Sequence, residues 1–129
     1  MDPTNTHGAF SWNELTTADV EGAKQFYGEM FGWTYEEMPT DDGSLYIAAM
    51  LGDTPMGGIM ARPDSMPEHI PSFWGSYVTV DDVDAAVEKA KALGGHVALE
   101  PLDITGVGRL AVIIDPQGAA LSLITYAKR

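Results

Sequence analysis

Three side chains that could recognise a ligand occur at every second position near the start of the chain. Trp12, Glu14 and Thr16 fall in the run 10–17, whose composition predicts a β-strand, so all three should share one of its faces. Glu14 is the only acid expected there; a partly desolvated carboxylate can bind a cation or act as a general base. A solvated carboxylate at the edge of a dimer would explain Glu14 equally well. Glu14 is therefore the best catalytic candidate, and its role stays open.

Trp12 has two interpretations that the residues do not separate. Its indole ring could form a wall on which a ligand stacks, or it could fill space that a ligand or metal ion would otherwise occupy. Either interpretation makes it a candidate for the ligand-binding face.

A second group of polar side chains is expected on other strands. Tyr77 and Thr79 lie in the predicted strand 73–80, and they too should share a face. With Thr16, they could hydrogen-bond a ligand, although such hydroxyl groups more often satisfy neighbouring backbone. The remaining candidates are Tyr46 and Ser122, each on a predicted strand.

Other polar residues favour structural roles. Ser122 lacks a nearby histidine, so it is not expected to be a nucleophile. Arg109 could hold a carboxylate ligand, but an ion pair with surface acids is the simpler interpretation. The segment 41–43, Asp-Asp-Gly, lacks the spacing of a calcium loop and predicts a turn.

The usual donors for a transition metal are scarce. The chain has no cysteine, and its three histidines, His7, His69 and His96, share no ligand spacing. We therefore expect neither a metal site nor a cofactor.

A repeated pattern of elements positions these residues. Asp19 opens a predicted helix that ends at Gly32, and Asp82 opens another that ends at Gly94–Gly95. Each helix follows a strand and precedes three more, at 34–38, 45–51 and 56–61 in the first half and at 96–102, 109–114 and 119–126 in the second. The two helix starts are 63 residues apart. Two βαβββ modules that pack together are predicted, because one alone would bury too little.

The same pattern predicts the domain organisation. Residues 1–8 should be a flexible tail, and 9–129 a single domain made of module one (9–61), a proline-rich connector (62–71) and module two (72–127). The predicted fold class is α+β, with a curved mixed sheet around a cleft suited to a small molecule.

Composition narrows the classes of partner. With 45% hydrophobic and 20% charged residues, the chain resembles a packed globular protein, and no apolar run is long enough to span a bilayer. A net charge of −12 repels nucleic acid and anionic lipid and would attract a cationic ligand. We expect a cytoplasmic protein that binds neither nucleic acid nor membranes.

Three segments then resemble one family. The first helix segment, TTADVEGAKQFYGEMFGW, resembles that of the vicinal oxygen chelate superfamily (glyoxalase, bleomycin resistance protein and extradiol dioxygenase). VTVDDVDAAVEKAKALGG and VIIDPQGAALSLI resemble the helix and last hairpin of its second module. The resemblance implies the glyoxalase-like fold, often within a homodimer.

The resemblance also implies positions for a divalent metal, and this chain departs from them. They correspond to Trp12, Gly75, Ser122 and a residue within 58–60. Indole has no free lone pair, glycine has no side chain, and a lone hydroxyl is a weak ligand. The usual metal site is therefore expected to be degenerate.

Three functions remain as predictions. The leading one is a bleomycin-resistance-like protein that binds a small organic molecule, with cationic molecules among the candidates, without a metal. The second is a lyase- or isomerase-type enzyme that uses a relocated metal or Glu14 as base. The third is a non-catalytic interaction module whose cleft is closed around Trp12.

Overall fold

A computed structural model describes residues 1–39, 45–64, 66–104 and 106–127. The chain forms two compact units: Trp12–Gly75, called here the first unit, and Met1–Ser11 together with the residues from Ser76 onward, called the second. The division falls inside strands β1 (Phe10–Thr17) and β5 (Phe73–Thr79). The predicted turn at Asp42–Gly43 lies outside the described residues.

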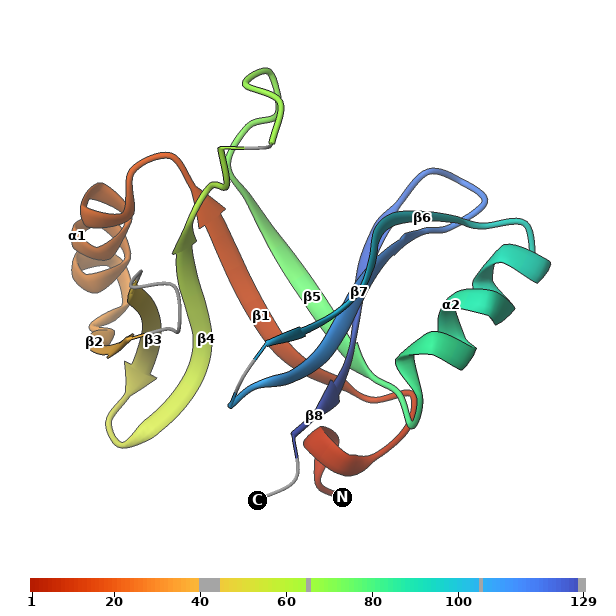
Figure 1. Cartoon of the computed structure of the whole chain (residues 1–129). Helices are drawn as coiled ribbons and strands as arrows, with labels where there is room; N and C mark the ends of the chain where they lie inside the picture. The colour runs from red at the N-terminus through yellow and green to blue at the C-terminus, as the bar shows by residue number, and fades with distance from the viewer. Residues whose placement is uncertain (40–44, 65, 105, 128–129) are drawn as a thin grey trace. The chain divides into compact units, whose positions relative to one another are not determined.

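The first unit contains α1 (Val20–Phe31), β2 (Thr34–Pro39), β3 (Leu45–Leu51) and β4 (Thr54–Ala61), together with most of β1. Its strands pair in the order β2-β3-β4-β1 (Figure 1). β1 and β4 run parallel, and the other pairs are antiparallel. This is the predicted βαβββ arrangement.

Helix α1 begins and ends where the sequence predicted. The Asp19 carboxylate accepts a hydrogen bond from the Gly22 amide, 2.9 Å away, and Gly32 closes the helix in the left-handed conformation at φ 76°. Strand β4, by contrast, starts at Thr54 rather than at Met56. Gly52, at φ 60°, allows a tight turn, so β3 and β4 pair right up to it.

The core of the first unit lies between its sheet and α1. Leu15, Ile47 and Ile59 are buried, with four half-buried residues packed on them: Val20, Ala23, Tyr27 and Tyr35. Side chains alternate along β1, so Trp12 and Glu14 lie on the face opposite Leu15, as predicted.

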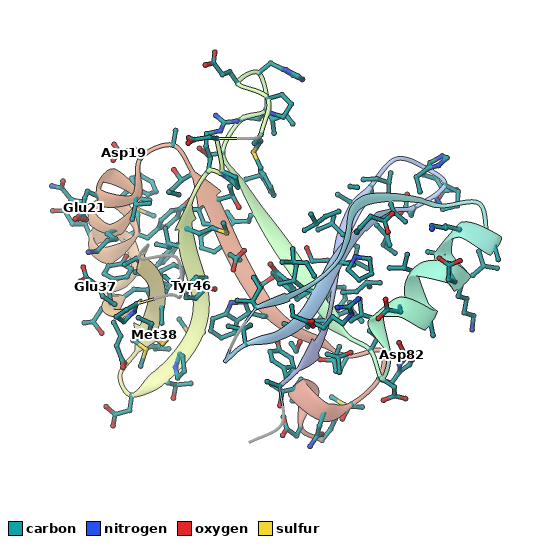
Figure 2. The ribbon with its side chains drawn as sticks, in the orientation of Figure 1. Asp19, Glu21, Glu37, Met38, Tyr46 and Asp82 are labelled. Atoms are coloured by element: carbon teal, nitrogen blue, oxygen red, sulfur yellow. The ribbon has the colours of Figure 1, made fainter. Side chains whose placement is uncertain are left out.

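The second unit repeats the arrangement with α2 (Val83–Ala92), β6 (His96–Ile104), β7 (Gly108–Ile114) and β8 (Ala120–Tyr126). Its strands pair in the order β5-β8-β7-β6 (Figure 1). Asp82 caps α2 by accepting from the Ala85 amide at 3.1 Å, and Figure 2 labels both capping residues, Asp19 and Asp82, at the starts of their helices. Two α2 residues, Val83 and Val87, enter the core.

The N-terminal residues are held by hydrogen bonds, where the sequence predicted a flexible tail. Pro3–Asn5 form a short 3-10 helix (η1) capped by Asp2. The Gly8 amide donates to the Thr79 carbonyl, and the Thr79 amide donates to the Ala9 carbonyl, both at 2.8 Å. This segment therefore continues the pairing of the second unit.

Within the predicted connector 62–71, of which residue 65 lies outside the described part, two backbone hydrogen bonds link nearby residues. Met66 and Ile70 donate backbone hydrogen bonds to Pro63 and Pro67, at 3.0 and 3.1 Å. No helix in the described residues is long and apolar enough to cross a bilayer.

Candidate functional site

A chain of hydrogen bonds joins three of the predicted residues on one face of the first unit. The Trp12 indole Nε1 donates to the Tyr46 hydroxyl oxygen at 2.7 Å, and this hydroxyl donates to the Glu14 Oε2 at 2.8 Å. All three residues are half-buried. Tyr46 therefore links the aromatic ring and the carboxylate into one polar group, here called the Trp12–Tyr46–Glu14 chain.

Gly58 leaves room for the Trp12–Tyr46–Glu14 chain. Tyr46 projects from β3, and β4 separates β3 from β1, so its side chain must cross β4 to reach Glu14 (Figure 2). Gly58 is the β4 residue paired with Glu14 on one side and with Ala48 on the other. A Cβ at Gly58 would collide with the hydroxyl and ring of Tyr46. The missing side chain at Gly58 therefore provides the space for the tyrosine.

The Trp12–Tyr46–Glu14 chain could bind a ligand or take a proton from it. A phenol that donates to a carboxylate holds one of its oxygens in a fixed position, and such charge-assisted bonds are stronger than neutral ones. An oriented carboxylate can accept a hydrogen bond from a ligand, attract its positive charge or remove its proton. The neighbouring indole adds an aromatic surface for stacking or for a cation.

The residues of the first unit do not fit the metal site that the family resemblance implies. The Trp12 nitrogen carries its hydrogen and donates it to Tyr46, so it offers no lone pair. The space beside Gly58, in the segment 58–60 where one ligand position is implied, is taken by the Tyr46 hydroxyl. Among the described residues, no three His, Cys, Asp or Glu side chains are grouped so that they could hold a metal ion.

Two other predicted residues are neighbours in the second unit. Tyr77 on β5 and Ser122 on β8 are partners in a parallel pair, so their side chains leave the sheet on the same face. Both are half-buried. The structure thus supports grouping Tyr77 with Ser122.

Thr79 and Thr16 are buried and not exposed on the surface of the sheet. The Thr79 hydroxyl lies 2.7 Å from the Pro3 carbonyl oxygen and 2.8 Å from the Ser11 Oγ, which is itself 2.8 Å from the Tyr126 hydroxyl. Burial raises the pKa of Tyr126, which keeps its hydroxyl protonated. Thr16 is only 7% exposed. The structure therefore shows Thr79 engaged with the N-terminal segment, and a role for either threonine in ligand binding stays a prediction.

Arg109 forms the surface ion pair that was the simpler expectation. Its Nε and Nη2 donate to both carboxylate oxygens of Asp84 at 2.7 and 2.9 Å, and its Nη1 lies 3.2 Å from Asp103. These bonds raise the pKa of Arg109 and lower the pKa of Asp84. Arg109 therefore ties β7 to α2.

Sequence reasoning placed Tyr46 on a strand bordering the ligand-binding face but did not predict its contacts. The hydrogen bond to Glu14 spans 32 residues and depends on the register of three strands. The one local signal was the Gly57–Gly58 pair, since a glycine inside a strand often marks close approach by another group.

Comparison with known proteins identifies the family of the chain. A family model described as "Glyoxalase/Bleomycin resistance protein/Dioxygenase superfamily" matches residues 9–123. The chain belongs to this superfamily, and the predicted recognition and α+β glyoxalase-like fold class are confirmed.

Individual relatives differ in their names. "Putative glyoxylase CFP32" of Mycobacterium tuberculosis is 40% identical over 117 residues, which are 90% of this chain and 45% of that protein. "Anthracycline biosynthesis protein DnrV" of Streptomyces peucetius is 31% identical over 128 residues, covering 90% of this chain and 46% of that protein. The chain thus spans about half the length of these curated relatives.

Solved structures show the same fold at lower identity. Methylmalonyl-CoA epimerase from Mycobacterium tuberculosis superposes with a TM-score of 0.68 at 18% identity, covering 96% of this chain and 92% of that one. A variant of the Streptomyces coelicolor epimerase gives 0.66 at 14% identity, covering 95% and 100%. At these identities the likeness concerns the fold.

Proposed function

We propose that the protein binds a small organic molecule at the Trp12–Tyr46–Glu14 chain, without the metal used by many members of the superfamily. The observation that carries the proposal is the pair of hydrogen bonds through the Tyr46 hydroxyl, which hold a carboxylate next to an indole ring on one face of a sheet. Thr16, on the same face of β1, would help to orient the ligand, and ligand contacts of Tyr77, Thr79 and Ser122 stay predictions.

We infer that the ligand is a planar aromatic molecule with an amine or hydroxyl group. An indole offers a flat stacking surface, and a carboxylate accepts hydrogen bonds from such donors. The net charge of −12 favours a positively charged ligand over an anionic one. The name of the relative DnrV, which refers to anthracycline biosynthesis, supports an aromatic ligand.

A binding assay tests this proposal. Chelator-treated protein is screened by thermal shift against molecules that carry both aromatic rings and amine groups, including anthracyclines and bleomycin, and affinity is measured by calorimetry. Glu14→Gln should weaken binding about 10- to 100-fold, because a hydrogen bond to a charged group contributes roughly 1.5–3 kcal/mol. Glu100→Gln, which neutralises an exposed carboxylate on β6, is the matched control and should leave affinity unchanged.

Two results of this assay would contradict the proposal. No thermal shift with any compound would refute the ligand proposal and favour the non-catalytic interaction module. Equal loss of affinity in both variants would mean that net charge, and not the Glu14 carboxylate, attracts the ligand.

A second candidate function is acid–base catalysis by Glu14. The Tyr46 hydrogen bond to Oε2 favours it, because a fixed carboxylate is the arrangement a general base needs, and a relative carries the name glyoxylase. Methylglyoxal with glutathione is a suitable probe, with product formation measured for wild type and Glu14→Gln. Turnover abolished by Glu14→Gln would support catalysis. Turnover lost on chelation, with one divalent ion per chain by elemental analysis, would instead indicate a relocated metal.

We also propose that the protein is cytoplasmic and forms a homodimer. Two copies with a charge of −12 each repel one another, so contact would need a surface poor in charge.

A further inference from the structure

Large apolar side chains are exposed around α1 and the start of β5 in the first unit. Four of them are about half exposed: Phe26 (57%), Phe31 (54%), Phe73 (41%) and Trp74 (41%). Met30, at 59%, lies one turn beyond Phe26 on α1. These five residues are called here the α1 patch; α1 itself packs on Leu15, on the opposite face of β1 from Trp12 and Glu14.

The α1 patch rests on an ordered cluster of rings. Tyr27 stacks on Trp33, with ring centroids 5.7 Å apart, and meets Trp74 edge-on at 5.5 Å. The Trp74 Nε1 also donates to the Tyr27 hydroxyl at 3.1 Å. Because these rings already hold one another, a partner that contacts them would lose little side-chain freedom on binding.

The two helices differ in how many of their residues are buried. Helix α2 buries Val83 and Val87, whereas no residue of α1, all of which the structure describes, is buried. Two hollows flank Trp74, one of about 370 Å³ and one of about 440 Å³. The side of α1 nearest β5 is therefore incompletely packed within one copy of the chain.

We infer that the α1 patch is the surface through which two copies of this chain associate, each presenting the same patch to the other. The inference rests on the homodimer proposed above and names its interface. A two-fold dimer needs a self-complementary surface, and an apolar patch provides one.

Charge favours a second copy at this surface. Among the described residues that line the two hollows, Asp19 alone is charged, and its carboxylate is already bonded to the Gly22 amide at the start of α1. Lys24, on the same helix, lies 3.3 Å from Glu21 and 3.7 Å from Glu37. In a chain with a net charge of −12, the surroundings of these hollows, which carry few charges, are where two copies can meet with least repulsion.

The size of the patch is also adequate. A buried aromatic side chain covers about 150–250 Å², so the exposed parts of the α1 patch amount to roughly 400–600 Å². A standard interface buries about 800 Å² per partner, of which a polar rim contributes part. The α1 patch is thus large enough to form the centre of such an interface.

Sedimentation velocity across the micromolar range tests the inference, with Phe26→Lys as the main variant. Wild type should sediment as a dimer of the 13.9 kDa chain, and Phe26→Lys should weaken association at least tenfold because it buries an unpaired charge. Phe31→Lys is a second variant at an exposed site. Leu93→Lys, at the 69% exposed Leu93 of the second unit, is the matched control and should remain dimeric. All three variants make the net charge less negative, so general repulsion cannot explain a loss of association.

Each result has one meaning. A monomeric wild type refutes both the homodimer and its interface. A dimer that both phenylalanine variants leave intact refutes the α1 patch as the interface and keeps the homodimer. Circular dichroism identifies a variant that fails to fold, and tryptophan emission that shifts to longer wavelength on dilution supports exposure of Trp74 on dissociation.

Discussion

Replacing Gly58 by alanine should break the Trp12–Tyr46–Glu14 chain without removing any of its members. The added Cβ would collide with the Tyr46 hydroxyl and ring, so the tyrosine must move and give up its bonds to Trp12 and Glu14. A neutral hydrogen bond contributes about 1 kcal/mol and one to a charged group about 1.5–3 kcal/mol. Alanine recovers about 0.5–1 kcal/mol of backbone entropy relative to glycine.

The expected net loss is therefore about 1.5–3.5 kcal/mol in the free energy of unfolding, or roughly 6–14 °C in Tm. Urea denaturation followed by circular dichroism measures it, and a change in the emission of Trp12 should accompany it. Gly28→Ala is a matched control, because its Cβ would meet neighbours only at ordinary distances, the nearest 3.5 Å away, and a helical alanine should stabilise.

A double-mutant cycle makes the test specific. If Tyr46 is the group that the Gly58→Ala methyl displaces, Gly58→Ala should cost less in a Tyr46→Ala background, where the hydroxyl and the ring are both absent. An unchanged Tm for Gly58→Ala, or the same cost in both backgrounds, would refute this explanation of the site.

Two further predictions concern the second unit. Arg109 lowers the pKa of Asp84 below 3.8, so their pair stabilises the folded state above that pH and the stabilisation is lost as the pH falls through the lowered pKa. Arg109→Gln should therefore lower the urea midpoint at neutral pH but not in strong acid; a pH-independent difference would contradict this. Thr79→Val removes the hydroxyl that hydrogen-bonds the Pro3 carbonyl and the Ser11 Oγ. The change should lower the free energy of unfolding by about 1 kcal/mol and speed amide hydrogen exchange at Gly8. Unchanged exchange there would show that Thr79 does not hold the N-terminal segment.

Much of the fold could be predicted because its signals are local. Apolar residues at helical spacing, acidic caps at Asp19 and Asp82, and the left-handed glycine at Gly32 each act within a few residues. The turn after β7 is similar, since Asp115 accepts from the Gln117 amide and Gly118 adopts φ 95°. The βαβββ repeat followed from these signals, and the family match agrees with it.

The candidate site could be predicted only in part. Alternation along β1 placed Trp12 and Glu14 on one face, because that requires only a strand. The contacts of the N-terminal residues could not be predicted from the sequence. Their polar, aperiodic sequence predicts no regular structure, yet Thr79, 76 residues from Pro3, provides a hydrogen-bond partner.

The sequence by itself determined which residues form strands and helices and which side chains share a face, since both depend on local periodicity. The tertiary structure alone decided that Tyr46 crosses β4 at Gly58 to join Trp12 to Glu14. That contact requires the pairing of three strands to be in one particular register, and strand register is set by the packing of the whole sheet. It also decided which aromatic side chains α1 leaves exposed, because helix periodicity predicts an apolar face but not how much of it a single copy of the chain can cover.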